Sequence, residues 1–242
     1  MGLISDHVLS PQAFLDECLG FKREQRVRSR YMQELLIGKL DRARIALWAK
    51  DFYYYVEPAI PSIAAWLASA PTLPDRDLHQ LVARNLAGEM GYIKEAEHHD
   101  LYLQFCDKGL GISRQELLDF LPLPTTIGAA SVVGHYCRSS FIEGLGAFGL
   151  AVELELPEMP GAGKILYDAL KTHYQISEAA LEFFYVHIEA EEEHGENARR
   201  ALKLCAQTRE QQALIRRAYR FSVLAHNGMR EGYDRLLTAP TS

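Results

Sequence analysis

Residues 183–197 read Phe-Phe-Tyr-Val-His-Ile-Glu-Ala-Glu-Glu-Glu-His-Gly-Glu-Asn, and this stretch indicates more about the fold than any other. Apolar residues at 180, 183, 184, 198, 201 and 202 recur at intervals of three and four, so they mark one stripe of a helix. Continued through the middle, the stripe carries His187, Glu191 and His194. Two imidazoles and a carboxylate therefore occupy positions where a helix normally has buried apolar side chains.

These three groups suit a metal ion better than a solvated surface. At spacings of i, i+4 and i+7 they share one helical face. A buried carboxylate is costly unless it is paired or bound to a metal, and the other acids of the stretch fall mostly on other faces. Glu191 and His194 also have the Glu-x-x-His spacing with which helical bundles hold paired iron or manganese. We therefore predict that His187, Glu191 and His194 are metal ligands.

One helix cannot complete such a site, so other helices must supply carboxylates. Glu153 is the first candidate, because it follows Ile142, Gly146 and Leu150 at helical spacing. Its alternative is an ordinary exposed glutamate near the end of a helix.

The segment 76–107 offers two further ligand sets. Glu95 and His98 form a second Glu-x-x-His, and the distance from Glu57 to Glu95 equals that from Glu153 to Glu191. The rival set is Glu89 with His99. On a helical wheel the apolar stripe of this segment centres near Glu89 and has His99 at its edge, whereas His98 falls on the opposite side. We favour Glu89 and His99 and leave the other register open.

The rest of the chain is predicted to be helical and to form an all-α bundle. Long stretches are rich in Ala, Leu, Glu, Arg and Gln, and strand-type alternation is not evident. Pro58 and Pro61 should kink or split one long helix, and Ser113 with Glu116 is typical of a capping box. The helices are expected at 11–19, 23–37, 41–69, 76–107, 113–120, 125–156, 161–173, 177–206 and 209–237.

Length and composition set the broad class. The chain has 242 residues, which suits one domain over 1–242, with 1–22 as an N-terminal extension and 238–242 as a frayed tail. A net charge of −6 argues against a nucleic-acid partner. The four dispersed cysteines form no metal knuckle, and neither a signal peptide nor a membrane span is recognisable. These features predict a cytoplasmic protein with no membrane partner.

With these residues in place, the chain resembles the haem-oxygenase-like diiron oxidases and oxygenases, over about residues 24–235. His187-x3-Glu191-x2-His194 is similar to the family's third metal helix, in which many members have Asp in place of the glutamate. Glu153-x3-Pro157, followed by Lys164, resembles the second. The ten-residue interval between Glu89 and His99 resembles the first metal helix of members that oxygenate nitrogen. The resemblance implies a haem-oxygenase-like bundle of about seven core helices.

The resemblance also implies a chemistry. The expected cofactors are two Fe(II) ions, with O2 as cosubstrate and a peroxo-diferric intermediate, and a manganese/iron or dimanganese centre would use the same ligands. Glu153 would bridge the metals, and Glu153 and Glu191 would be the catalytic carboxylates. The expected reaction is N-oxygenation, desaturation or oxidative C–C cleavage of a small amino-acid-like substrate, in natural-product biosynthesis. Arg138 and Lys164 are the candidate substrate-binding residues, and a homodimer and an external electron donor are expected.

Other functions fit parts of the sequence. A fatty-acid decarboxylase or a self-sacrificing aminobenzoate synthase would share the metal site, and Tyr31 with Lys164 lies near the positions that the latter uses. A metal-free thiaminase-like hydrolase on the same fold would use Cys137 as its nucleophile, but it would leave His187, Glu191 and His194 unexplained. A non-enzymatic iron-storage or haem-binding protein is a further alternative.

Overall fold

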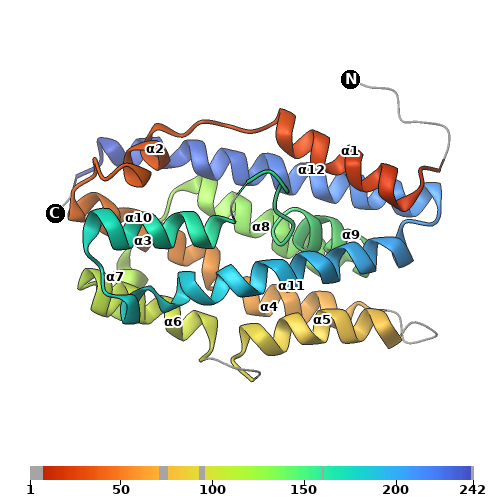
Figure 1. Cartoon of the computed structure of the whole chain (residues 1–242), viewed down its shortest axis with the longest axis horizontal. Helices are drawn as coiled ribbons and strands as arrows, with labels where there is room; N and C mark the ends of the chain where they lie inside the picture. Colours follow the sequence, from red (N-terminus) through yellow and green to blue (C-terminus); the bar gives the residue numbers. More distant parts are fainter. Residues whose placement is uncertain (1–7, 71–75, 93–95, 160, 241–242) are drawn as a thin grey trace.

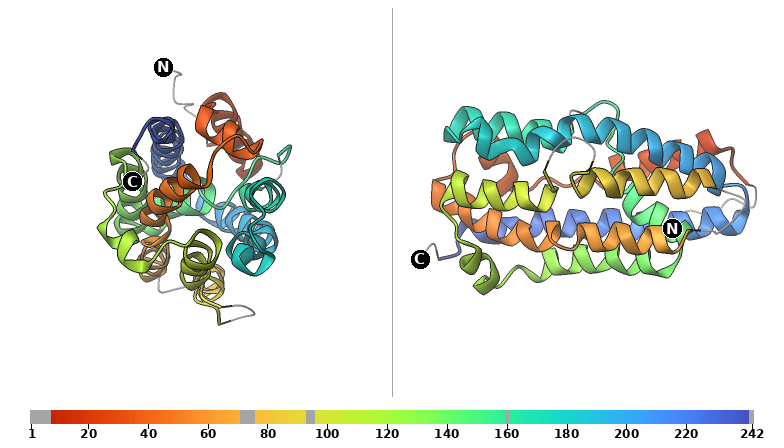
Figure 2. Two further views of the ribbon diagram at one scale, coloured as in Figure 1. Left: turned by 90° about the vertical axis from the view of Figure 1, so that its left-hand side faces the viewer. Right: turned by 90° about the horizontal axis from the view of Figure 1, so that it is seen from below.

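The structure is a computed structural model that describes residues 8–70, 76–92, 96–159 and 161–240, without the side chains of 189–193. The described part is helical, with no strand in it. Its helices run mainly along one long axis (Figures 1 and 2). The α-helices are α1 (Pro11–Glu24), α2 (Arg30–Leu36), α3 (Arg42–Val56), α4 (Ala59–Ala68), α5 (Arg76–Glu89), α6 (His98–Gln104), α7 (Arg114–Asp119), α8 (Pro124–Ser139), α9 (Phe141–Gly144), α10 (Ala162–Tyr174), α11 (Glu182–Cys205) and α12 (Arg209–Gly232). Short π- or 3-10 helices are η1 (Phe105–Leu110), η2 (Leu145–Leu150), η3 (Glu178–Leu181) and η4 (Tyr233–Leu237).

Several predicted boundaries are confirmed. The Asp41 side chain accepts a hydrogen bond from the backbone N–H of Arg44 at 2.7 Å and so begins α3. Ser113 and Glu116 form the capping box of α7. The predicted 41–69 helix is split at Pro58, because proline lacks the backbone N–H that would continue α3 into α4. The segment expected to be an N-terminal extension contributes α1, which buries Phe14 in the core.

The predicted continuous helix 76–107 is wrong, because α5 ends at Glu89 and α6 begins at His98. Gly91 has a φ of +72°, a left-handed conformation that glycine adopts without strain. The N–H of Tyr92 donates to the carbonyl of Ala87 at 2.9 Å, as in the Schellman motif that ends many helices. The turn at Gly91 therefore ends α5 at Glu89, and α6 begins at His98 with its own helical phase.

The predicted helix 125–156 is also interrupted, at two places. Ser140 is extended, with φ −165° and ψ 161°, so α8 stops and α9 begins after it. Residues of η2 then form a π-helix, and the N–H of Glu153 donates to the carbonyl of Phe148 at 3.1 Å. A π-turn is wider than an α-turn and is frequent at functional sites. This one leads directly to Glu153.

The apolar core has two halves, and α11 crosses both. One half is built around Trp66 by α1, α4, α5, α8, η2 and the C-terminal part of α11. The other is built around Trp48 by α2, α3, α6, η1, α10 and the N-terminal part of α11. Phe184 of α11 belongs to the second half and Leu202 to the first, with His187 and His194 between them. The middle of the bundle is therefore a polar layer between two apolar halves.

Figure 1 shows how the helices frame this layer. Along one side of the bundle α5 and α6 follow each other end to end, and α11 passes alongside both. Their junction brings the last residue of α5 and the first of α6 opposite the middle of α11. No helix in the described part is long and apolar enough to be a membrane span.

Candidate metal centre

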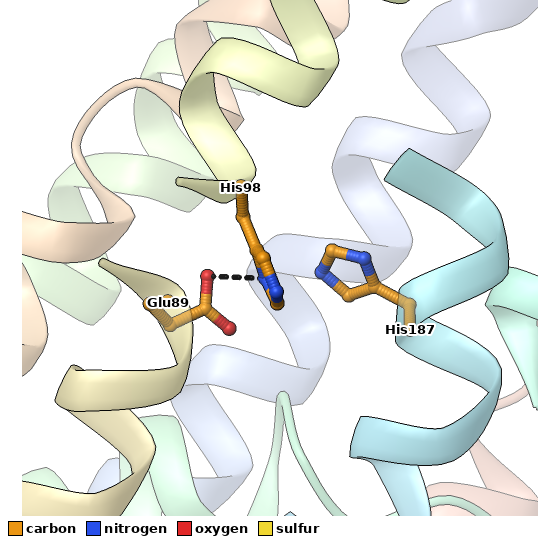
Figure 3. Close-up of side chains that lie close together, drawn as sticks. All are labelled: Glu89, His98 and His187. Carbon is orange, nitrogen blue, oxygen red and sulfur yellow. Dashed lines mark ion pairs between the residues drawn. The ribbon is translucent and has the colours of Figure 1, made fainter. Parts of the chain in front are cut away.

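The centre begins with the two residues that flank the break between α5 and α6. His98 Nδ1 lies 2.9 Å from Glu89 Oε2 (Figure 3). Both residues are buried, with 2% of His98 and 8% of Glu89 exposed. A buried carboxylate and imidazole in contact stabilise each other's polar atoms, which offsets part of the cost of removing them from water.

His187 faces this pair from α11. Its ring centroid lies 4.6 Å from that of His98, and Figure 3 shows both rings directed toward Glu89. His187 Nδ1 lies 2.6 Å from the carbonyl oxygen of Phe183, so it carries the proton and donates it. This leaves the lone pair on Nε2 available, which is the usual arrangement of a histidine that ligates a metal.

A second group of ligand atoms adjoins the first. His194 Nδ1 lies 3.0 Å from Glu153 Oε2, and both side chains are about nine-tenths buried. One ligand atom from each of Glu89, Glu153 and His194 lies within 4.8 Å of the others, and the same holds for Glu89, His98 and His187. Glu89 therefore belongs to both groups, whereas the sequence predicted that Glu153 would be the bridge.

The histidines keep Glu89 charged. Burial is the largest influence on its pKa and raises it, but the hydrogen bond and charge of His98, with the charges of His187 and His194, outweigh burial. The pKa of Glu89 therefore lies below its usual value. Burial lowers the pKa of His187, which favours the neutral imidazole that a metal needs.

A buried amide pair fixes α5 against α11 beside the centre. Asn197 Nδ2 donates to Asn85 Oδ1 at 3.0 Å, and both residues are buried. Asn85 lies one turn before Glu89, and Asn197 lies one turn after His194. The hydrogen bond therefore sets the distance between the two helices next to the ligand atoms.

The sequence matches the family described as iron-containing redox enzyme over residues 46–226. This chain belongs to that family. The matched region contains the whole cluster of Glu89, His98, Glu153, His187 and His194. Carboxylate and imidazole donors without a thiolate suit iron, so the donor set fits the metal in the family's description. A comparison with curated proteins finds no significant match.

Solved structures confirm the haem-oxygenase-like fold of this chain. A domain of unknown function with a heme oxygenase-like fold from Shewanella denitrificans has a TM-score of 0.74 at 16% identity, covering 94% of this chain and 93% of that chain. A TenA homolog from Pseudomonas syringae has a TM-score of 0.72 at 15% identity, covering 98% of this chain and 99% of that chain. A CADD-like protein of unknown function from Nostoc punctiforme has a TM-score of 0.72 at 16% identity, covering 93% of this chain and 97% of that chain. At these identities the likeness concerns the fold alone.

The predicted pairing of Glu89 with His99 needs a correction, because the structure places His98 beside Glu89 instead. The helical wheel assumed one continuous helix, and the break at Gly91 changes the phase of every residue after it. His99 lies against Tyr53, with ring centroids 5.9 Å apart. Gly91 could have revealed the break, since a glycine just past a helix end is typical of a helix stop.

Of the rival register, His98 joins the cluster of ligand atoms. Glu57 is exposed at the end of α3 and joins neither group of ligand atoms in the described structure. Glu95 lies outside the described residues. Glu191 lies on α11 between His187 and His194, but its side chain is outside the described part, so it stays a prediction.

The two predicted substrate-binding cations lie away from the centre. Arg138 is exposed, and its guanidinium donates to the carbonyl of Gly134 at 2.8 Å within α8. Lys164 is exposed and pairs with Asp168 one turn along α10, at 2.7 Å. Charged side chains near a motif in sequence are directed outward here, because their helices use the opposite face for the core. Neither residue belongs to the two groups of ligand atoms, and substrate binding by Arg138 and Lys164 stays a prediction.

A half-buried tyrosine–histidine pair was missed by the sequence analysis. The Tyr55 hydroxyl forms a short hydrogen bond with Nε2 of His226 on α12. His226 Nδ1 donates to the carbonyl of Ser222 at 2.7 Å, so Nε2 accepts the hydrogen bond that the Tyr55 hydroxyl donates. Burial lowers the pKa of His226 to about 4 and raises that of Tyr55, where the charge of Glu153 contributes further. Since the partners lie 171 residues apart, no local pattern could have paired them.

Proposed function

We propose that this protein is a non-haem oxidoreductase that holds a pair of iron ions in the centre of its bundle and activates O2 with them. The single observation that carries the proposal is the place of Glu89 in both groups of ligand atoms. A carboxylate that belongs to two groups of ligand atoms, one with His98 and His187 and the other with Glu153 and His194, is suited to be a shared ligand of two ions. The proposed ligands are Glu89, His98, Glu153, His187, Glu191 and His194.

The chain's own residues prepare the centre for this chemistry. When bound, a pair of Fe(II) ions supplies two electrons to O2. Glu89 is held ionised by its histidines, and the Nδ1–H of His187 is held by the Phe183 carbonyl so that Nε2 faces inward. The Phe183 ring lies 4.4 Å from the His187 ring and 5.0 Å from that of Tyr102, so apolar side chains exclude water on this side.

The proposed substrate is a small amino-acid-like molecule, oxidised by N-oxygenation, desaturation or oxidative C–C cleavage. This part rests on the resemblance of the metal motifs to those of amino-acid-oxidising enzymes. An external electron donor and a homodimer belong to the same proposal. The alternatives that share the metal centre are a fatty-acid decarboxylase and an aminobenzoate-synthase-like enzyme. For the latter, the candidate Tyr31 is buried, and its hydroxyl donates to the backbone carbonyl of Arg44 at 2.7 Å.

A metal-free hydrolase that uses Cys137 is the weaker alternative. The Cys137 side chain is fully buried, and burial raises the pKa of its thiol to about 12. The thiolate is the reactive form, so this cysteine is a poor nucleophile near neutral pH. We expect Cys137→Ala to keep its iron and its activity, whereas loss of activity with full iron content would favour the hydrolase.

The deciding experiment compares two adjacent histidines. We expect His98→Ala to lower the affinity for Fe(II) by at least about 100-fold, because it removes a ligand, and His99→Ala to bind iron like the wild type. Anaerobic Fe(II) titration and metal analysis of the desalted protein measure this. Reaction of the loaded protein with O2, in the presence of a panel of amino acids and fatty acids, then identifies the substrate class.

Each outcome separates the possibilities. Normal iron content in His98→Ala with loss in His99→Ala would restore the register predicted from the sequence. Normal iron content in both variants, and also in Glu89→Gln, would rule out the proposed centre. Glu57→Gln serves as a control, since this exposed carboxylate joins neither group.

A further inference from the structure

A small apolar pocket lies between the end of α3, α4, α8 and η2. It has a volume of about 40 Å³, and Ala59, Ala130, Val133, Phe148 and Val152 contribute to its walls. Val133 and Phe148 are buried, whereas Ala59 and Ala130 are half-buried. The pocket therefore extends from near the surface into the interior.

The inner wall of the pocket is the segment that carries a proposed metal ligand. Val152 directly precedes Glu153, and the N–H of Glu153 donates to the carbonyl of Phe148 at 3.1 Å. The pocket is therefore connected to Glu153 through Val152, the residue before it, and through Tyr55, whose pKa the charge of Glu153 raises. A molecule that occupies the pocket is next to the proposed metal centre.

The chemistry of the walls restricts the occupant. Of the lining residues, Tyr55 and Ser62 are polar and none is charged. The Tyr55 hydroxyl is committed to His226 and so presents mainly its ring to the pocket. An ammonium or carboxylate group placed here would be buried without a partner, which costs several kcal/mol. Apolar cavities of this kind stay dry and accept small uncharged molecules such as xenon.

We propose that this pocket is a docking site for dioxygen on its path to the metal centre. Dioxygen is uncharged, apolar and small enough for the volume, whereas an amino-acid-like substrate would bring charges that the walls cannot pair. The inference rests on the proposed function, since it assumes that the centre consumes O2. It adds a site that is separate from the ligands and assigns it a specific molecule.

The first test is structural and does not depend on iron. Crystals of the protein are pressurised with xenon, which binds where small apolar gases bind. We expect a xenon atom between Val133 and Phe148 in the wild type and none in Ala130→Leu, whose larger side chain fills the pocket. An empty pocket in the pressurised wild-type crystal would overturn the proposal.

The second test is kinetic. We expect Ala130→Leu and Ala59→Leu to lower the second-order rate constant for oxidation of the Fe(II)-loaded protein by O2 by about tenfold, at unchanged iron content. Ala64→Leu is the matched control, because Ala64 lies on α4 like Ala59 but is exposed. Two variants from different walls guard against misfolding of either one.

The outcomes distinguish this inference from the proposed function. Wild-type reactivity toward O2 in both folded variants would overturn the docking site and leave the iron centre intact. A raised KM for the substrate at an unchanged O2 rate constant would also overturn it, because the pocket would then hold part of the substrate. Failure of the wild type to bind iron at all would overturn the proposed function, and this inference with it.

Discussion

At the scale of single residues, the centre depends on how a few polar atoms are committed. Glu89 ends a helix, is buried and is surrounded by three imidazoles. Each imidazole that donates one proton to a fixed acceptor leaves its other nitrogen available. His187 does so through the Phe183 carbonyl, and His226 does the same through Ser222 but accepts from Tyr55 instead of facing the centre. The two histidines therefore differ in what Nε2 contacts: in the proposed ligand His187 it faces the centre, whereas in His226 it is bonded to Tyr55.

The half-buried His226 predicts a pH dependence of stability. Burial lowers its pKa to about 4 in the folded protein, whereas a histidine in the unfolded chain has a pKa of about 6.5. As the pH falls below about 6.5, the unfolded state binds a proton that the folded state does not, so the free energy of unfolding falls until about pH 4. The glutamine in His226→Gln can still accept the hydrogen bond from the Tyr55 hydroxyl. Between pH 6.5 and pH 4, we expect the free energy of unfolding of this variant to fall by about 1–3 kcal/mol less than that of the wild type.

Urea unfolding of the metal-free protein at several pH values measures this difference. The exposed His135→Gln on α8 is the control for removing a histidine from the surface. His187, whose pKa burial also lowers, keeps part of the pH dependence in every variant. Equal pH dependence in His226→Gln and in the wild type would show that His226 takes up its proton without cost in the folded state.

At the scale of elements, the junctions matter more than the helices themselves. The break between α5 and α6 places Glu89 and His98 side by side although they are nine positions apart. The π-turn η2 lies between an α-helical start and Glu153, and it packs closely on α12. Both irregular places are found where the centre needs a side chain directed inward.

The close packing of η2 on α12 predicts the effect of one methyl group. A Cβ on Gly146 would lie 2.5 Å from the backbone carbonyl oxygen of Ile215, so α12 would have to move. We expect Gly146→Ala to lower the free energy of unfolding by about 1–3 kcal/mol. Gly128→Ala on α8 is the control, because a Cβ there meets nothing within 4 Å.

Urea denaturation compares the two variants. Gly128→Ala should raise stability by about 0.5–1 kcal/mol, since alanine loses less backbone entropy than glycine in a helix. Both variants replace glycine with alanine, but their effects on the free energy of unfolding should have opposite signs. Equal effects would show that η2 and α12 can separate freely and that the packing at Gly146 does not constrain them.

At the scale of the whole molecule, the polar layer divides the apolar core into two halves. The proposed ligands come from α5, α6, the segment after η2, and α11, so an ion bound to them would connect elements of both halves. Without an ion, the buried polar atoms of this layer contribute less to stability than apolar packing would. The layer is therefore the place where metal binding and folding are coupled.

This coupling predicts that iron stabilises the fold. Binding to the folded state alone, at an Fe(II) concentration of about 100 times Kd, adds about 2.7 kcal/mol. For a chain of this size we expect an increase in Tm of about 5–10 °C in anaerobic thermal unfolding. Glu89→Gln should show little increase, because it removes the carboxylate that both groups share. An equal increase in this variant would mean that iron binds elsewhere.

The class of fold and the type of site could both be predicted from local patterns in the amino-acid sequence. The apolar stripe around residues 183–202 indicated a core helix with two histidines on its buried face, and the structure places His187 and His194 in the polar layer. The helical character, several caps, Glu89 and Glu153 were recognised in the same way. These are local properties, because helical periodicity and capping involve residues within a few positions of one another.

Which polar groups contact one another depends on the three-dimensional packing of the helices. A wheel drawn through a helix that breaks at Gly91 assigned His99 where His98 lies, and nothing local could pair Tyr55 with His226 or place Arg138 and Lys164 outside. Which side chains come into contact depends on the relative phase of the helices on either side of a break and on contacts between residues far apart in the chain. Both are set by packing of the whole bundle, which a local pattern does not contain.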